Sequence, residues 1–553
     1  MSVPAPKTGG RLVLGLLALT QFLMTLDASV MNVSIGALVE DLDTSVTAIQ
    51  GVITAYTLVM AAAMITGGKL GDLLGRRRAL RIGLVVYACG SAVTALAPNV
   101  GVLLLGWSVL EGLGAVLIMP TVIALIAGNF TGRARAAAYG TIAAAAAVAV
   151  ALGPIIGGFV TAYYSWRWVF AAEVVIAAAI LLASRIVRDA PAEGRTRLDI
   201  VGALLSASGL GLLVFGVLQS GSWGWVRPRV ADGPDATPAL FGISAVTWLV
   251  VGGLLLVLAF VSWQMRRVAR GDAPLVDPAL FANRQLTGGL SVLLMQYLVM
   301  MGMFFAMPLF LSLCLGLDAF DTGLRMLPLS LALVVAAPTV PKLFPAASPR
   351  RVVQAGLLLM LAASLLLAAR LEDGADASIT TLPFLLMGLG MGAMASQLGN
   401  VVVSSAPVES GSEVGGLQYT AQNLGSSLGT ALVGAIVIGS LGTLVVQGIQ
   451  ESPQLGEATK QSVTAGVDSG VGFVSDAEVT ATLSETGLPG SERQAITEIY
   501  AGARLDALRN GMIALSLFVI VALFISARLP AKPLPDDGAG TEPGLDAAPA
   551  RGP

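Results

Sequence analysis

The sequence predicts an all-helical integral membrane protein that crosses the bilayer fourteen times. Of its 553 residues, 55% are hydrophobic and 12% are charged, whereas soluble proteins carry about 25% charged residues. A helix needs about 20 mostly apolar residues to span a bilayer, and runs of this kind recur along the whole chain. This composition excludes an ordinary soluble enzyme.

The predicted spans fall into three groups, and each span follows from an apolar run between two polar breaks. The first six runs lie at about 12–37, 47–70, 79–98, 101–126, 136–162 and 168–187. Two more lie at about 199–219 and 240–263. The last six lie at about 287–313, 322–342, 352–370, 380–404, 415–445 and 511–528.

These groups predict an N-terminal six-helix bundle, two inserted membrane helices, a C-terminal six-helix bundle and a disordered cytoplasmic tail rich in Pro, Gly, Ala and Asp. The ranges expected for the four parts are 1–190, 191–270, 271–529 and 530–553. Within the third part, a long polar segment at about 446–510 is expected to form an extracellular loop.

The distribution of positive charge predicts the orientation. An even number of spans places both termini on one side, and lysines and arginines of short loops stay in the cytoplasm. With the N-terminus inside, the inner segments hold 23 of the 32 basic residues. We therefore expect a multi-pass protein of the cell inner (cytoplasmic) membrane with both termini in the cytoplasm.

Several classes of function lack the residues they need. There is no histidine, and the two cysteines, Cys89 and Cys314, lie inside apolar runs, so neither a zinc site nor a disulfide framework is expected. The net charge is −2 without a long basic stretch, which gives nucleic acid no binding surface. No Gly-x-x-x-x-Gly-Lys-Ser/Thr loop is present to bind ATP. We expect no enzyme activity, no metal and no cofactor.

A short internal repeat indicates two related halves. Lys69 and Leu70 are followed by Arg77 and Arg78, and the same spacing recurs 273 residues later as Lys342, Leu343, Arg350 and Arg351. Two-half symmetry is typical of transporters in which two bundles move about a shared site. The alternative explanation is that basic residues gather in inner loops because of membrane orientation alone.

Acidic residues inside predicted spans are the main candidates for chemistry. Asp27 lies in the first span and Glu111 near the middle of the fourth, and a carboxylate at such a depth must face a cavity or a partner and not lipid. A buried carboxyl group can take up a proton from one side of the membrane and release it to the other. The alternative is a hydrogen-bonded residue that only packs the bundle. Glu173 lies close to the outer boundary of the sixth span, where solvation at the membrane interface is the favoured interpretation.

Other polar and small residues supply weaker candidates. Gly153, Pro154, Gly157 and Gly158 can form a hinge or a close helix contact in the fifth span. Gln418 and Gln422 share one helical face, where they could line a cavity or bond to another helix. Further cavity candidates are Asn32, Tyr297 and a run of methionines and phenylalanines that includes Met295, Met301, Met303, Phe304 and Phe305.

Three motifs carry a resemblance to a known family. GGKLGDLLGRRR, from Gly67 to Arg78, resembles the cytoplasmic signature of the major facilitator superfamily and follows the second span. GPIIGG at 153–158, with Gly140 ahead of it, resembles the antiporter signature of that superfamily. Together with LDASVMNV in the first span, WRWVF at 166–170 and the fourteen spans, they resemble the fourteen-span drug:proton antiporter family, of the multidrug efflux type.

The resemblance implies a major facilitator fold, made of two six-helix bundles plus two inserted helices, and a polyspecific exporter driven by inward proton flow. It implies that Asp27 couples transport to protons. It also implies an inner gate latch formed by Gly68, Gly71, Asp72, Gly75, Arg76 and Arg77, and an antiporter hinge formed by Gly153, Pro154, Gly157 and Gly158.

The chain departs from the family pattern in its buried charges. Ser108 stands where the fourth span usually carries Arg, Glu111 where Gln is expected, and Glu173 where Asn is common. Gly36 replaces a frequent Pro, and Pro345 replaces the Asp of the second-half loop. Losing a buried cation and gaining an anion favours protonated acids or a cationic substrate.

The favoured interpretation is a monomeric transporter, surrounded by membrane lipids, that exports amphipathic and in part cationic small molecules or drugs, as in antibiotic resistance. The proton motive force supplies the energy, and Asp27 and Glu111 carry the exchange. The alternatives are a dedicated exporter of one metabolite or lipid, and a membrane sensor or scaffold that has lost transport.

Overall fold

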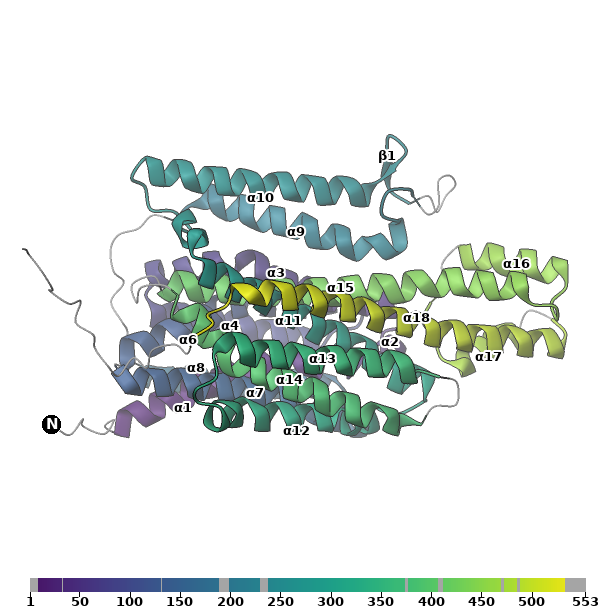
Figure 1. The fold of residues 1–553 in the computed structure, drawn as a ribbon, viewed down its shortest axis with the longest axis horizontal. Coiled ribbons are helices and arrows are strands. Elements are labelled where there is room, and N and C mark those ends of the chain that lie inside the picture. The colour runs from purple at the N-terminus through teal and green to yellow at the C-terminus, as the bar shows by residue number, and fades with distance from the viewer. Residues whose placement is uncertain are drawn as a thin grey trace, which may run out of the picture.

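The computed structural model describes residues 8–31, 33–130, 132–187, 198–228, 237–372, 376–405, 411–468, 472–484 and 488–532. Over these ranges the protein is almost entirely helical, and its long helices lie side by side along the longest axis of the molecule (Figure 1). Within the described ranges, fourteen helical segments are long and apolar enough to cross a membrane, which confirms the predicted number of spans. Asn32 and the tail from residue 533 onward lie outside the described residues.

The first half of the chain forms one bundle, in which α1 packs on α7, α4 packs on α6 and α8, and α3 packs on α6. A π-helical segment, η1, connects α5 to α6, and a 3₁₀ turn, η2, follows α8. The bounds are α1 (Thr8–Val30), α2 (Ile35–Asp41), α3 (Val46–Leu74), α4 (Arg76–Ala95), α5 (Val100–Leu103), η1 (Leu104–Glu111), α6 (Gly112–Asn129), α7 (Gly132–Tyr163), α8 (Arg167–Ala183) and η2 (Ser184–Ile186).

Two inserted helices, α9 (Ile200–Trp223) and α10 (Ala245–Ala269), lie against each other along one edge of the molecule (Figure 1). A small antiparallel pair of strands precedes α10 and consists of β1 (Ala239–Leu240) and β2 (Ile243–Ser244). α9 also packs on α3 and α15, so the pair covers a junction between the two halves.

The second half forms another bundle, in which α11 packs on α15, and α14 packs on α12 and α13. The two halves meet where α3 packs on α15 and where α7 packs on α12. The bounds are η3 (Pro278–Ala282), α11 (Arg284–Leu309), η4 (Phe310–Cys314), α12 (Ala319–Leu343), α13 (Pro349–Arg370), η5 (Ala377–Thr380), α14 (Thr381–Val403), α15 (Gly411–Glu451), α16 (Glu457–Asp468), α17 (Asp476–Ser484), α18 (Gly490–Ile525) and η7 (Ser526–Arg528).

The segment expected to be a long outer loop is largely helical. α15 continues to Glu451, α18 starts at Gly490, and both project with α16 and α17 from one end of the molecule (Figure 1). Arg504 is only 2% exposed and pairs with Asp476 at 2.7 Å, which fastens α17 to α18. Polar helices outside a membrane give no apolar run, so hydropathy alone could not identify them.

The connection between α3 and α4 is shorter than the sequence indicated. α3 extends to Leu74 and α4 begins at Arg76, so Gly68, Gly71 and Asp72 are helical. Within this connection, Gly75, with φ of 89°, has the backbone conformation that favours glycine. A single residue therefore makes the turn.

Candidate functional site

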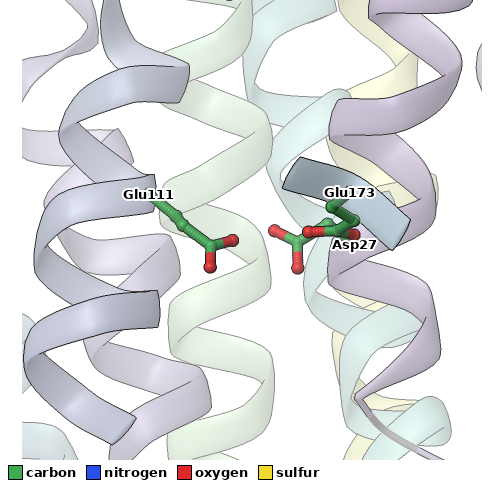
Figure 2. Close-up of side chains that lie close together, drawn as sticks. All are labelled: Asp27, Glu111 and Glu173. Carbon is green, nitrogen blue, oxygen red and sulfur yellow. The ribbon is translucent and has the colours of Figure 1, made fainter. Parts of the chain in front are cut away.

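Three carboxylates meet inside the first bundle, and Figure 2 shows them facing one another. Asp27 comes from α1, Glu111 from the end of η1 and Glu173 from α8, and each is at most 1% exposed. One oxygen of each lies within 4.8 Å of the others. We call these residues the carboxylate cluster. The structure brings together the two predicted acids and also Glu173, which was expected to be solvated near the membrane boundary.

Each carboxylate is fixed by donors on one oxygen. The indole Nε1 of Trp107 donates to Asp27 Oδ1 at 2.9 Å. The Thr94 hydroxyl donates to Glu111 Oε1 at 3.1 Å. Glu173 Oε2 accepts from the Tyr87 hydroxyl at 2.8 Å and from the Ser91 hydroxyl at 3.4 Å.

The second oxygen of each carboxylate is buried and, among the described residues, has no hydrogen-bond partner. The Tyr56 hydroxyl is also buried beside Asp27, although it makes no hydrogen bond of ordinary geometry. Buried polar groups are usually paired. Four unpaired oxygens in one place indicate a site that binds protons or a ligand.

The described residues offer the cluster no compensating positive side chain. Within the described part of the chain, no lysine or arginine forms an ion pair with any of its members. Ser108, at the position where a buried Arg was expected from the family pattern, is fully buried and donates to the Val52 carbonyl at 2.7 Å. Three ionised carboxylates at this spacing would repel one another strongly. The cluster must therefore hold positive charge in the form of protons or a small cation.

Local backbone packing positions the cluster. Trp107, Ser108 and Glu111 all lie in η1, and π-helical segments inside α-helices often occur at functional sites. Gly90 of α4 lies against this segment, because a Cβ atom there would come within 2.6 Å of the Glu111 backbone nitrogen. The Trp107 ring stacks on Tyr56 with 4.9 Å between the ring centroids, which fixes the indole that donates to Asp27.

The predicted hinge glycines connect the cluster to the boundary between the halves. A side-chain carbon at Gly153 would collide with Ser29, two residues after Asp27, and one at Gly157 would lie 2.7 Å from Val30 Cγ1. α7 therefore lies directly on α1. On its other side, the Pro154 carbonyl touches Gly323 of α12. Gly158 lies in the same stretch of α7.

The predicted gate residues lie at the C-terminal end of α3 and the start of α4, and none of them belongs to the carboxylate cluster. Gly68 faces Pro120, and Gly71 faces Thr121, both on α6. Arg76 donates to the Ala124 carbonyl at 3.2 Å, which ties the start of α4 to α6. Asp72 lies in the last turns of α3 and Arg77 in the first turn of α4.

The predicted cavity residues are not members of the cluster. Tyr297 on α11 and Gln418 and Gln422 on α15 are half-buried in the second half. Between the halves, the Tyr419 hydroxyl donates to Gln21 Oε1 at 3.2 Å.

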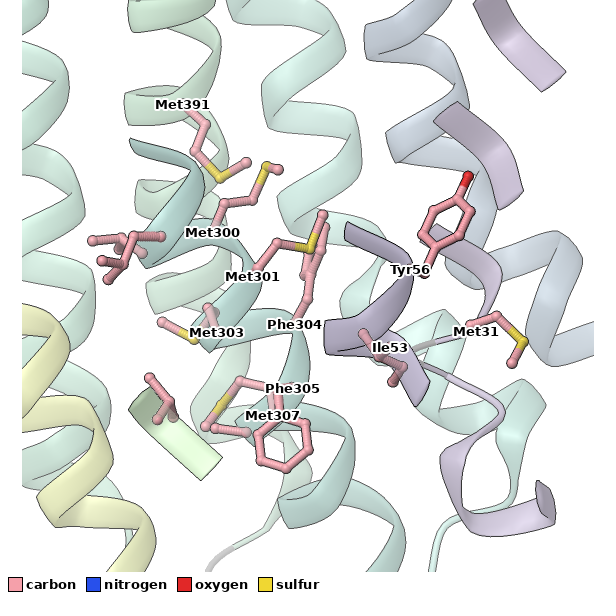
Figure 3. Packing of buried hydrophobic residues seen from close by; sticks show 14 of the residues in the cluster. Met31, Ile53, Tyr56, Met300, Met301, Met303, Phe304, Phe305, Met307 and Met391 are labelled. Atoms are coloured by element: carbon pink, nitrogen blue, oxygen red, sulfur yellow. The ribbon is translucent and has the colours of Figure 1, made fainter. Parts of the chain in front are cut away.

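A dense group of methionines and phenylalanines fills α11, and Figure 3 shows these side chains together with Met31, Ile53 and Tyr56 of the first half. The members of this group are buried. They are Met300, Met301, Met303, Phe304, Phe305 and Met307. Methionine side chains adapt their shape to irregular apolar partners, so this group can pack against varied apolar neighbours.

One signal in the sequence could have identified Glu173. Tyr87, Ser91 and Thr94 are spaced four and three residues apart, so their hydroxyls share one face of α4. That row donates to both Glu173 and Glu111. A line of buried donors predicts acceptors on the neighbouring helices.

Comparison with known proteins places the chain among membrane transporters. The model of the Major Facilitator Superfamily matches residues 17–430. The tetracenomycin C resistance and export protein of Streptomyces glaucescens is 28% identical over 524 residues, which cover 93% of this chain and 91% of that protein. The puromycin resistance protein of Streptomyces alboniger is 32% identical over 444 residues, covering 79% and 83%. A multidrug efflux pump of Mycolicibacterium smegmatis is 29% identical over 437 residues, covering 79% and 82%.

Solved structures agree on the fold. A bacterial homolog of the human lysosomal transporter Spinster, in an inward-facing state, superposes with a TM-score of 0.58 at 15% identity and covers 95% of this chain and 98% of that one. A D-xylose–proton symporter superposes with a TM-score of 0.55 at 14% identity, covering 95% and 99%. At this identity the likeness concerns the fold alone.

Proposed function

The chain belongs to the Major Facilitator Superfamily, and from that premise we propose that it exports amphipathic, in part cationic, small molecules across the cytoplasmic membrane in exchange for protons. Support comes from relatives whose names describe antibiotic export, antibiotic resistance and multidrug efflux. The proposal describes a transporter and not an enzyme, working as a monomer with both termini in the cytoplasm. It needs no bound cofactor, because the proton motive force supplies the energy.

The observation that carries the proposal is that the carboxylates of Asp27 and Glu111 lie close together in one buried site. Both are buried, both keep one oxygen without a partner, and no described basic side chain neutralises them. Protons arriving from outside and a cationic group arriving from inside would compete for the same negative charge. Competition of this kind couples the two movements, provided that the two access states bind each ligand with different affinity.

The change of access would be a rocking of the two halves. The halves touch along α3–α15 and α7–α12, and the Pro154 region contacts both α1 next to Asp27 and α12. A structural change at Asp27 can therefore be transmitted through α7 to the boundary between the two halves. The gate residues that surround Gly75 and Arg76 would stabilise one of the two states at the inner surface.

A dedicated exporter of a single compound is the second candidate. Several relatives carry the names of single compounds, among them the tetracenomycin C and puromycin resistance proteins. The fold and the carboxylate cluster would serve this function equally well. Only the range of molecules moved separates the two candidates.

The experiment is drug-driven proton movement in inside-out vesicles with a panel of cationic and neutral amphiphiles. Wild type should discharge the proton gradient with several cations, and Asp27→Asn or Glu111→Gln should suppress the response. Glu478→Gln, which removes an exposed carboxylate on α17, is the matched control. A response to one compound only would favour the dedicated exporter. No response from a folded protein to any compound would refute proton-coupled export.

A further inference from the structure

Glu173 belongs to the first bundle alone. Its helix, α8, packs on α4, α1 and α7, all in the first half. The residue is buried, one of its carboxylate oxygens has no hydrogen-bond partner among the described residues, and its carboxylate lies beside those of Asp27 and Glu111 (Figure 2). Glu173 therefore lies inside the cluster without lying on a helix that forms the main contacts between the halves.

The hydrogen bonds of Glu173 are one-sided. Both donors, the hydroxyls of Tyr87 and Ser91, reach the same oxygen, Oε2, and Oε1 has no partner in the described part of the chain. A carboxylate that served packing alone would be expected to have both oxygens satisfied. Here two donors hold one oxygen, and the other oxygen is left without a partner in a cluster that contains two further acids.

The titratable groups around Glu173 are acidic or neutral, so its carboxylate is expected to bind protons. The titratable groups that face it are Asp27 from α1, Glu111 from η1 and Tyr87 from α4, with Tyr56 of α3 nearby. None of them is cationic. Each additional negative charge in the cluster makes the others hold protons more tightly.

We propose that Glu173 is a third proton-binding residue, which raises the proton capacity of the exchange site from two carboxyl groups to three. This inference rests on the proposed function, because it concerns the protons that cargo displaces. Glu173 binds and releases a proton with Asp27 and Glu111, and cargo binding at the cluster then displaces protons from a shared set. The number released depends on all three residues.

The test is a direct count of protons. Purified protein in weakly buffered, EDTA-treated choline chloride is saturated with radiolabelled tetraphenylphosphonium, and a pH indicator reports the protons released per molecule bound across a range of pH. Glu173→Gln should release fewer protons per bound molecule. It should also move the midpoint of the profile to lower pH by about one unit or more, because the remaining acids lose a negative neighbour.

Tyr87→Phe is the second variant and should act in the opposite direction. It removes the donor that stabilises ionised Glu173, so the midpoint should move to higher pH while the maximal number of released protons stays at the wild-type value. A loss of packing alone would not move the two midpoints in opposite directions. Glu478→Gln should match wild type in both measurements.

The inference is overturned if Glu173→Gln binds the probe with the wild-type proton count and midpoint, since Glu173 would then be structural. If wild type binds the probe without releasing protons, the proposed proton coupling itself fails. The two failures are therefore distinguishable in one data set.

Discussion

The two halves of the molecule share a helical plan but differ in the chemistry of their interiors. In the first half, Asp27, Glu111 and Glu173 are buried together. At the repeat offset of 273 residues, Asp27 corresponds to Met300 and Glu111 to Phe384, and both of these are buried as well. At these two positions the second half thus has apolar side chains where the first half has acids.

This difference separates two tasks that an exporter of amphipathic cations must perform. Under the proposed function, the first half would supply negative charge, and the second would supply adaptable apolar contact from buried side chains such as those in Figure 3. Among the described residues of the second half, Arg504 is the one buried charged side chain, and it lies in the projecting helical segment, where it pairs with Asp476 of α17. Changes in the first half should alter coupling, and changes in the second should alter cargo preference.

Among substitutions outside the carboxylate cluster, the largest effect is expected from Gly90→Val, which disturbs the position of Glu111. The new side chain would meet the Glu111 backbone nitrogen and Cγ, each 2.6 Å from the position of the added Cβ atom. Overpacking of this kind costs about 1–3 kcal/mol, and a displaced acid should lower coupled transport about 10- to 100-fold. Thermal unfolding and drug-driven proton movement measure the two effects.

Gly140→Ala is the control, because a Cβ atom there has no neighbour within 4 Å. It should leave both quantities close to wild type. Full coupling in a folded Gly90→Val protein would show that the position of Glu111 is not critical.

A smaller effect is expected from Met300→Leu in the second half. The swap keeps the side-chain volume and should cost less than about 1.5 kcal/mol of stability. Apparent affinities for different cargo molecules should change by about 3- to 10-fold, with some rising and others falling. The number of protons moved per molecule should stay the same, because no member of the carboxylate cluster changes. A changed proton number would contradict the division of tasks.

The smallest effect on transport is expected at Asp199, which precedes α9 outside both bundles. Burial opposes its ionisation, but hydrogen bonds from Gly202, Trp263 and Gln264, with Arg267 nearby, outweigh burial and lower the pKa of this carboxyl below its ordinary value of 3.8. Asp199→Asn should destabilise the α9–α10 pair by about 1–3 kcal/mol with little change in proton coupling.

The stability that Asp199→Asn is expected to lose depends on pH in a definite direction. Because the folded-state pKa of Asp199 is lowered, its stabilisation is complete above about pH 4 and disappears as the pH falls through the folded value. Unfolding of wild type and Asp199→Asn should therefore differ at neutral pH and converge in strong acid. A difference that persists at the lowest pH would assign the effect to packing.

Much of the fold could be predicted from composition and apolar runs, because bilayer thickness sets the length of each span. The same reasoning identified Asp27 and Glu111 as costly in lipid. It missed Glu173, because distance along the chain from the outer boundary says little about which face a residue occupies. It also missed α16 and α17, whose polar helices carry no hydropathy signal, and η1, because a π-helical register depends on the packing of α4 against Glu111.

The central claim, that the first half alone handles charge, is tested most directly by neutralising the whole cluster. Proteoliposomes would contain either wild type or the triple variant Asp27→Asn, Glu111→Gln, Glu173→Gln, with Glu478→Gln as control, and the assay would record proton movement driven by tetraphenylphosphonium. The account predicts full proton movement for wild type and control and none for a folded triple variant. Cation-driven proton movement that survives in the triple variant would contradict it.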